Sequence, residues 1–139
     1  MPRSPNKLGQ NTLFEDIDTI RTMLGLPVFL NPPYTSAAWD GDAKTAADSG
    51  IIDLSAAFSV TASVRAVYAT LAIKDGTVDV AATLGPDAAD DNALASRIQT
   101  ADQYDSNAAL VPCDANGDIY FTASGNLDNV YIEIWGWWP

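Results

Sequence analysis

From Ile51 to Trp137 the chain alternates short β-rich segments with residues that favour tight turns. The turn residues are mainly glycine, asparagine and aspartate, which accept the backbone angles that turns require. Short strands at this spacing predict an antiparallel sandwich or barrel. We expect strands at 51–54, 64–74, 78–84, 94–100, 107–113, 118–123 and 128–137.

Two of these segments alternate in a way that predicts which side faces the core. Side chains of a strand point to opposite faces of the sheet in turn, so the more apolar row is expected inside. In 64–74 the more apolar row is Arg65, Val67, Ala69, Leu71 and Ile73. In 128–137, Val130, Ile132 and Ile134 oppose Tyr131, Glu133 and Trp135.

A helix is predicted over 12–24. Thr12 and Glu15 form a capping box at its start. Gly25 provides a left-handed end, and Pro27 prevents continuation. One apolar stripe follows from spacings of four, three and four: Leu13, Ile17, Ile20 and Leu24. So short a helix is marginal alone, and its stripe must be buried on its own sandwich, between identical subunits or on another protein.

The remaining N-terminal residues predict extended chain. Residues 1–11 carry two prolines, Arg3 and Lys7, and are expected to form an arm. The linker PVFLNPPYTS (27–36) is expected to be a polyproline-like strap. A chain of 139 residues fits one ordinary domain. We therefore expect an arm, helix and strap in 1–34 and a sandwich domain in 35–139.

The charge is strongly acidic and uneven. The net charge is −11, and residues 22–139 carry 15 acids against 4 bases. Such a body repels phosphate backbones, which argues against nucleic-acid binding, and it favours solubility. The basic tip of the arm is suited to an acidic partner surface.

The groups that most enzymes need are scarce. The chain has no histidine, and Cys113 is its single cysteine. No disulfide or cysteine-pair zinc site can form within one chain, and no histidine is present to activate the thiol. Cys113 is expected to be a small buried hydrophobe. We expect no catalytic residue, metal or cofactor.

The segment Asp114 to Asp118 (DANGD) invites a calcium interpretation. An EF-hand loop starting at Asp114 would need glycine at Ile119 and glutamate at Gly125. The alternative, a tight hairpin turn with positive φ angles at Asn116 and Gly117, is the one we predict.

No membrane helix or signal peptide is predicted. The longest uncharged apolar run, Ala108 to Cys113, is far shorter than the about 20 residues that span a bilayer. The N-terminus has no apolar region after its first basic residue. We expect a protein that is made in a cytoplasm and stays soluble.

The C-terminus concentrates aromatic residues: Trp135, Trp137 and Trp138 lie within four positions. Three uses are open. These side chains can contact another subunit, or Trp135 can close the base of the sandwich while the last two stay partly exposed. They can also form a platform for a sugar.

Several of these segments resemble a jelly-roll-type β-sandwich module of tailed-bacteriophage structural proteins, found in head-decoration, minor tail and tail-fibre proteins. The resemblance covers about residues 35–138 and implies a fold and a particle context, with no catalytic residue. It lies in TSAAWDGD (35–42), IDLSA (52–56), VRAV (64–67), VPCDANGDIY (111–120) and YIEIWGW (131–137).

The sequence therefore predicts an all-β jelly-roll-type sandwich behind an arm and one short helix. Its expected function is that of a capsid decoration protein, a trimer fastened to the shell through Arg3, Lys7 and the apolar stripe. The alternative is a tail-fibre or tail-tip module that recognises a host glycan. An enzyme such as a glycan hydrolase is the third hypothesis, and the missing histidine and paired carboxylates argue against it.

Overall fold

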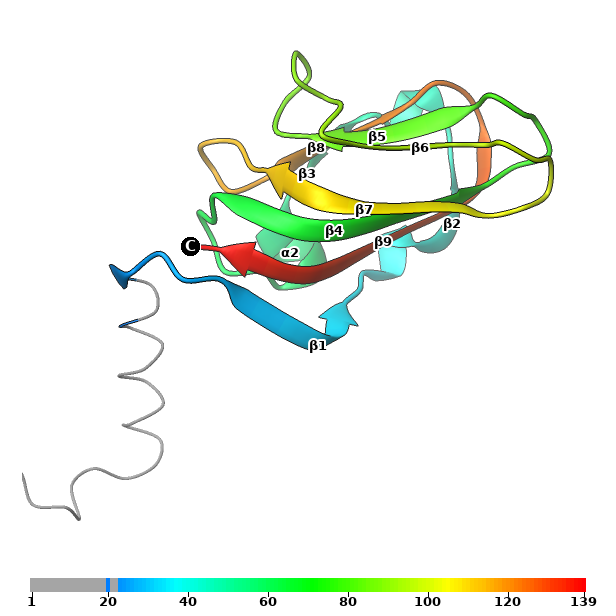
Figure 1. Cartoon of the computed structure of the whole chain (residues 1–139). Coiled ribbons are helices and arrows are strands. Elements are labelled where there is room, and N and C mark those ends of the chain that lie inside the picture. The colour runs from blue at the N-terminus through cyan, green and yellow to red at the C-terminus, as the bar shows by residue number, and fades with distance from the viewer. Residues whose placement is uncertain (1–19, 21–22) are drawn as a thin grey trace, which may run out of the picture.

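The computed structural model describes residue 20 and residues 23–139. Within that range the chain forms two antiparallel β-sheets and little helix (Figure 1). The all-β prediction is confirmed. The elements are β1 (Val28–Tyr34), β2 (Asp40–Lys44), β3 (Gly50–Ile52), α2 (Leu54–Phe58), β4 (Ala66–Lys74), β5 (Ala81–Gly85), β6 (Leu94–Arg97), β7 (Asp105–Pro112), β8 (Ile119–Ala123) and β9 (Leu127–Trp138), with 3₁₀ turns at Ala37–Trp39 and Ala46–Asp48.

The two sheets face each other as layers of a sandwich (Figure 1). The five-stranded sheet has the order β1-β9-β4-β7, and β2 also pairs with β9. The four-stranded sheet has the order β3-β8-β5-β6. Strands that are far apart in the sequence are therefore neighbours, and β9 forms the centre of the larger sheet together with β4.

The core lies between the sheets and follows the predicted alternation. Val67, Leu71 and Ile73 of β4 are fully buried. The inward row of β9 matches the prediction too, with its three members buried: Val130, Ile132 and Ile134. Only Arg65, before β4 begins, departs from its row, because its guanidinium lies at the surface and donates to the Pro139 carbonyl at 2.7 Å.

A β-bulge near the end of β9 changes which tryptophan is buried. Tyr68 pairs with Gly136, but the next residue of β4, Ala69, pairs with Ile134. Trp135 is therefore an extra residue, and the inward row resumes at Trp137. Trp137 is 8% exposed, whereas Trp135 and Trp138 are half-buried. Trp137, and not Trp135, closes this end of the core.

The predicted strand at 51–54 is wrong at its end. β3 stops at Ile52, and Leu54 begins helix α2. The Asp53 carboxylate caps this helix by accepting from the Ala56 N–H at 3.1 Å. Leu54 and Phe58, four residues apart, are the buried side chains of the helix. A capping aspartate followed by that spacing outweighs the β-rich composition.

The predicted strap is extended, but it is a strand. β1 pairs antiparallel with β9, with Val28 opposite Trp137 and Phe29 opposite Gly136. Pro32 and Pro33 are tolerated because β1 lies at the edge of the sheet. β2 has no predicted counterpart, because its sequence DGDAK lacks apolar alternation. Its backbone pairing with β9 defines it instead.

The Asn116-Gly117 turn is not a hairpin. It joins β7 to β8, which belong to different sheets. Gly117 has a φ of 81°, while Asn116 has no positive φ. The turn is held by the Asp114 carboxylate, which accepts from the N–H groups of Asn116 and Asp118. It therefore carries the chain from one layer of the sandwich to the other.

Most of the predicted helix at 12–24 lies outside the described residues. One hydrogen bond of its final turn is described: the Leu24 N–H donates to the Ile20 carbonyl at 3.0 Å. Gly25 has a φ of 66°, so the predicted left-handed end is confirmed.

Candidate interaction surface

The segment that leads into β1, residues Ile20 and Met23–Leu26, exposes large apolar side chains. Met23 is 80% exposed, Leu24 67% and Ile20 54%. In Figure 1 the described part of this segment stands beside the sandwich instead of lying across either sheet. Ile20 and Leu24, two members of the predicted stripe, are therefore not buried on their own body. The other members, Leu13 and Ile17, and the basic residues Arg3 and Lys7, lie outside the described residues.

An apolar groove of about 450 Å³ opens beside this segment. Leu26, Val28 and Leu30 form one wall, and Val64, Trp137 and Pro139 contribute to the rest. The β-bulge brings Trp137 to this place, since without the extra residue the indole would point to the opposite face. The end of the sandwich where the chain enters is thus both hollowed and apolar.

The two other C-terminal tryptophans lie on the outer side of the five-stranded sheet. The Trp135 indole N–H donates to the Thr70 hydroxyl at 3.0 Å, and Thr70 belongs to the outward row of β4. The Trp138 ring meets Phe29 of β1 edge to face, with ring centroids 6.0 Å apart. Phe29 is itself 72% exposed. Of the three tryptophans considered as a subunit contact, Trp135 and Trp138 are placed where another molecule can reach them.

The same outer face carries further exposed apolar side chains that the sequence analysis did not single out. Tyr68 pairs with Leu110 across β4 and β7, and these side chains are 40% and 47% exposed. The signal was present, because Tyr68 and Leu110 are apolar residues on the outward rows of their strands. Such residues on the solvent side of a sheet indicate a contact surface.

The opposite end of this face is polar and aromatic. Tyr104, 50% exposed, meets Tyr131 with ring centroids 5.8 Å apart, and the Lys74 ammonium lies 5.5 Å from the Tyr104 ring. A hydrogen bond to Tyr104 is the main cause that raises the pKa of Tyr131, and the nearby Asp40 adds to it. The Tyr131 phenol is therefore uncharged at neutral pH.

Several acidic side chains in turns and caps accept hydrogen bonds from backbone N–H groups, among them Asp53, Asp114 and Asp118. The hydrogen bond from the Ala56 N–H, followed by that from the Ser55 hydroxyl, lowers the pKa of Asp53. Burial is the main cause that raises the pKa of Asp118, against the opposing effect of the Leu54 N–H. No three acidic or cysteine side chains converge on a possible metal position within residues 20 and 23–139.

Cys113 packs against the core and is half-buried. Burial is the largest cause that raises the pKa of its thiol to about 12, and the carboxylates of Asp114 and Asp118 add to it. The expectation of a small apolar side chain fits this environment, although the burial is partial.

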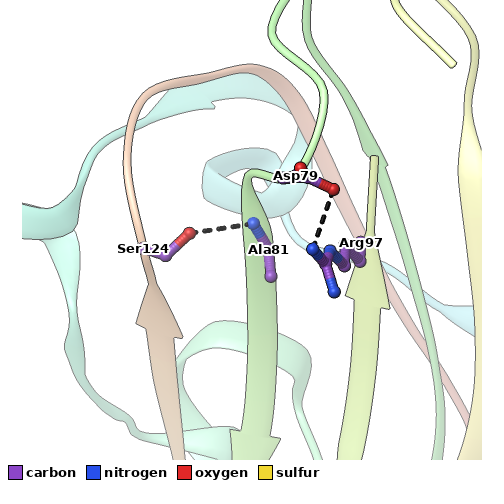
Figure 2. A network of polar contacts seen from close by, with 4 residues as sticks. All are labelled: Asp79, Ala81, Arg97 and Ser124. Atoms are coloured by element: carbon purple, nitrogen blue, oxygen red, sulfur yellow. Dashed lines mark hydrogen bonds and ion pairs between the residues drawn. The ribbon is translucent and has the colours of Figure 1, made fainter. Parts of the chain in front are cut away.

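One ion pair is found among the described residues, at the edge of the four-stranded sheet (Figure 2). The Arg97 guanidinium donates to the Asp79 carboxylate at 2.8 Å, and both side chains are more than half exposed. Figure 2 also shows the Ser124 hydroxyl accepting from the Ala81 N–H, at 2.9 Å. Both contacts hold loop ends to β5 and β6, and an exposed pair of this kind adds little stability.

No family model and no curated protein matches the chain. No helix among the described residues has the length and apolar character needed to cross a membrane.

Proposed function

We propose that the chain is a structural protein of a bacteriophage particle, a decoration protein that binds the capsid shell and stabilises it. The observation that carries the proposal is the leading segment, which displays Met23, Leu24 and Leu26 in front of a sandwich that has a complete core of its own. Exposing large apolar side chains to water is unfavourable in free energy, and burying them against a partner surface removes this penalty.

We further assign the sandwich to the jelly-roll class. The strand order supports this assignment when the short strand β2 is not counted. The remaining strands form four nested antiparallel pairs, β1 with β9, β3 with β8, β4 with β7, and β5 with β6. Folding such a nested ribbon over itself places β4 beside β9 and β5 beside β8, which closes the two sheets. Jelly rolls recur in viral capsid proteins and in lectins.

Attachment in this proposal is binding without chemistry. Each large apolar side chain that becomes fully buried contributes about 1.5–3 kcal/mol, so the leading segment and the stripe can together supply a stable contact. Arg3 and Lys7 bring positive charge to a chain whose body is acidic, and they suit an acidic region of the shell. Neighbouring shell subunits held by one decoration protein separate less readily.

The experiment compares the full chain with a variant that lacks residues 1–11. Both are mixed with undecorated capsids and sedimented over a range of salt concentrations. We expect equal melting temperatures, weaker co-sedimentation of the truncated protein, and a salt-dependent part of the difference because screening weakens charge attraction. A matched control is Arg97→Gln, which removes a positive charge from the exposed ion pair of the body. Equal co-sedimentation of the full and truncated proteins at every salt concentration would remove the arm from the proposal.

The second candidate is a tail module that binds a host glycan. The specific observation in its favour is the Tyr104–Tyr131 pair with Lys74 beside it, since sugar faces stack on aromatic rings and sugar hydroxyls bind polar neighbours. Tyr104→Ala leaves the core untouched, because the side chain is exposed. If this candidate holds, Tyr104→Ala loses binding to host cell envelopes. Neither this variant nor the unaltered protein then binds capsids.

A further inference from the structure

At its turn residue Gly25, the leading segment contacts the sandwich through one guanidinium group. Among the described residues, and apart from the chain neighbours of Gly25, one atom lies within 4 Å of the position that a Cβ on this glycine would take. That atom is the Arg65 Nη2, at 3.1 Å. In Figure 1 the segment enters beside the C-terminal end of β9, in agreement with the pairing of Val28 and Trp137. Arg65 therefore contacts the chain just before β1 begins.

The backbone of Arg65 is held on both sides. Its N–H donates to the Trp138 carbonyl at 2.8 Å, and its carbonyl accepts from the Cys113 N–H at 2.9 Å. The side chain is held as well, because its Nε–H donates to the Pro139 carbonyl at 2.7 Å. A guanidinium is planar and rigid, so a fixed Nε restricts the directions that the two terminal nitrogens can take. One of these nitrogens lies against Gly25.

The charge of Arg65 suits this position. Carbonyl groups at the C-terminal end of a helix carry a partial negative charge, and a cation close to that end is stabilising. The Leu24 N–H donates to the Ile20 carbonyl, which marks the final helical turn. The guanidinium lies at the next residue, Gly25, whose φ of 66° ends the helix. The contact is thus favourable in charge as well as in position.

The exposure of the leading segment needs a cause that opposes burial. Ile20, Met23 and Leu24 are more than half exposed, although an apolar groove opens beside them. Burial of such side chains in an apolar groove is favourable in water. A segment turned onto the groove would have to change the backbone at Gly25, where it contacts Arg65.

We infer that Arg65 is a positioning residue. Its guanidinium, anchored on the Pro139 carbonyl, holds the leading segment at Gly25 and keeps the apolar side chains directed away from the sandwich. The inference rests on the proposed function for its consequence alone, which is that side chains held outward are available to a shell surface. The positioning itself is a property of the purified protein.

The direction of the segment is measured by the distance between spin labels at Met23→Cys and Ile51→Cys, with Cys113→Ser in every protein compared. Both label positions are exposed. We expect one narrow distance distribution in the otherwise unaltered chain and a broader one in Arg65→Gln, which removes the charge and the planar group. Arg97→Gln is the matched control, because it also removes an exposed arginine contact, and it should keep the narrow distribution. Equal distributions with and without Arg65→Gln overturn the inference.

Amide exchange separates positioning from a general loss of stability. Loss of a cation at a helix end should speed exchange of the Leu24 amide by about two- to five-fold, while the amides of β4 and β9 keep their rates. Exchange that accelerates across β4 and β9 as well would assign Arg65 to the stability of the whole fold and contradict the inference.

The conservative variant Arg65→Lys separates charge from geometry. It should recover the exchange rate of the Leu24 amide, because the charge is kept. It should not recover the narrow distance distribution, because one ammonium group cannot hold the Pro139 carbonyl and contact Gly25 together. A narrow distribution in Arg65→Lys would mean that charge alone sets the direction, and it would overturn the role given to the guanidinium.

Gly25→Ala tests the same contact from the other side and also serves if Arg65→Gln fails to fold by circular dichroism. The added carbon would lie 3.1 Å from Nη2, so the guanidinium must move and the distribution should broaden. An unchanged distribution would count against the contact.

Co-sedimentation with undecorated capsids tests the consequence separately. Arg65→Gln alters no exposed apolar side chain, and we expect it to bind several-fold less because the segment is no longer held outward. Broadened distances with unchanged co-sedimentation would keep the role of Arg65 and remove the leading segment from the proposed function.

Discussion

Trp137 and Trp138 are adjacent in the sequence but occupy different environments. Trp137 is 8% exposed at the end of the core, while Trp138 is half-buried against Phe29. We predict that Trp137→Ala lowers the free energy of unfolding by about 3–5 kcal/mol, because it leaves a cavity in the core. Trp138→Ala removes one edge-to-face contact and should cost about 1 kcal/mol. Urea unfolding of both variants measures the difference, and equal losses would contradict the β-bulge assignment.

The Cys113 thiol provides a test of burial at a second residue. Because folding raises its pKa from 9.0 to about 12, the thiolate is disfavoured in the folded protein. Alkylation at pH 8 should therefore be much slower in the folded protein than in urea. The protonated Cys113 thiol also contributes to the stability of the folded state. That contribution to the free energy of unfolding is complete below pH 9.0 and is lost as the pH rises through about 12. Equal alkylation rates with and without urea would show that the thiol is open to solvent.

At the scale of elements, the pairing of β1 with β9 depends on Gly136. A Cβ added there would lie 2.5 Å from the Val28 carbonyl oxygen, which belongs to the paired strand. We predict that Gly136→Ala displaces β1 and costs about 1–3 kcal/mol. Gly50→Ala is the control, since nothing lies within 4 Å of the added carbon. Amide exchange over Val28–Tyr34 should accelerate in Gly136→Ala alone, and an unchanged rate would count against the close approach.

The sequence predicts the central strands well because their burial alternates. Apolar residues recur with a period of two along most of β4 and β9, so the alternation alone predicts both strands and their inward faces. The alternation does not predict β2 and α2, which lie at the margins of the sheets. β2 is polar and is held by backbone pairing to β9, and α2 depends on the capping carboxylate of Asp53. Neither cause produces an apolar pattern.

At the scale of the whole molecule, a surface is harder to predict than a core. The C-terminal tryptophans attract notice as a cluster, but the β-bulge that sends Trp137 inward and leaves Trp138 outside is a tertiary feature. The outer face of the five-stranded sheet joins Phe29, Tyr68 and Leu110, which are 39 or more positions apart in the sequence. Only the sheet order brings these residues into one row. The apolar stripe, by contrast, is a local sequence pattern, and its described members Ile20 and Leu24 are exposed.

The proposed function places the protein on the heads of virus particles. The most direct measurement is the position of a labelled antibody, raised against residues 35–139, on intact virions of the phage that carries the chain. The account predicts label over the capsid, and none on capsids stripped of the protein. Label confined to the tail tip would contradict the decoration proposal and favour glycan recognition, and particles without label would contradict a structural place in the virion altogether.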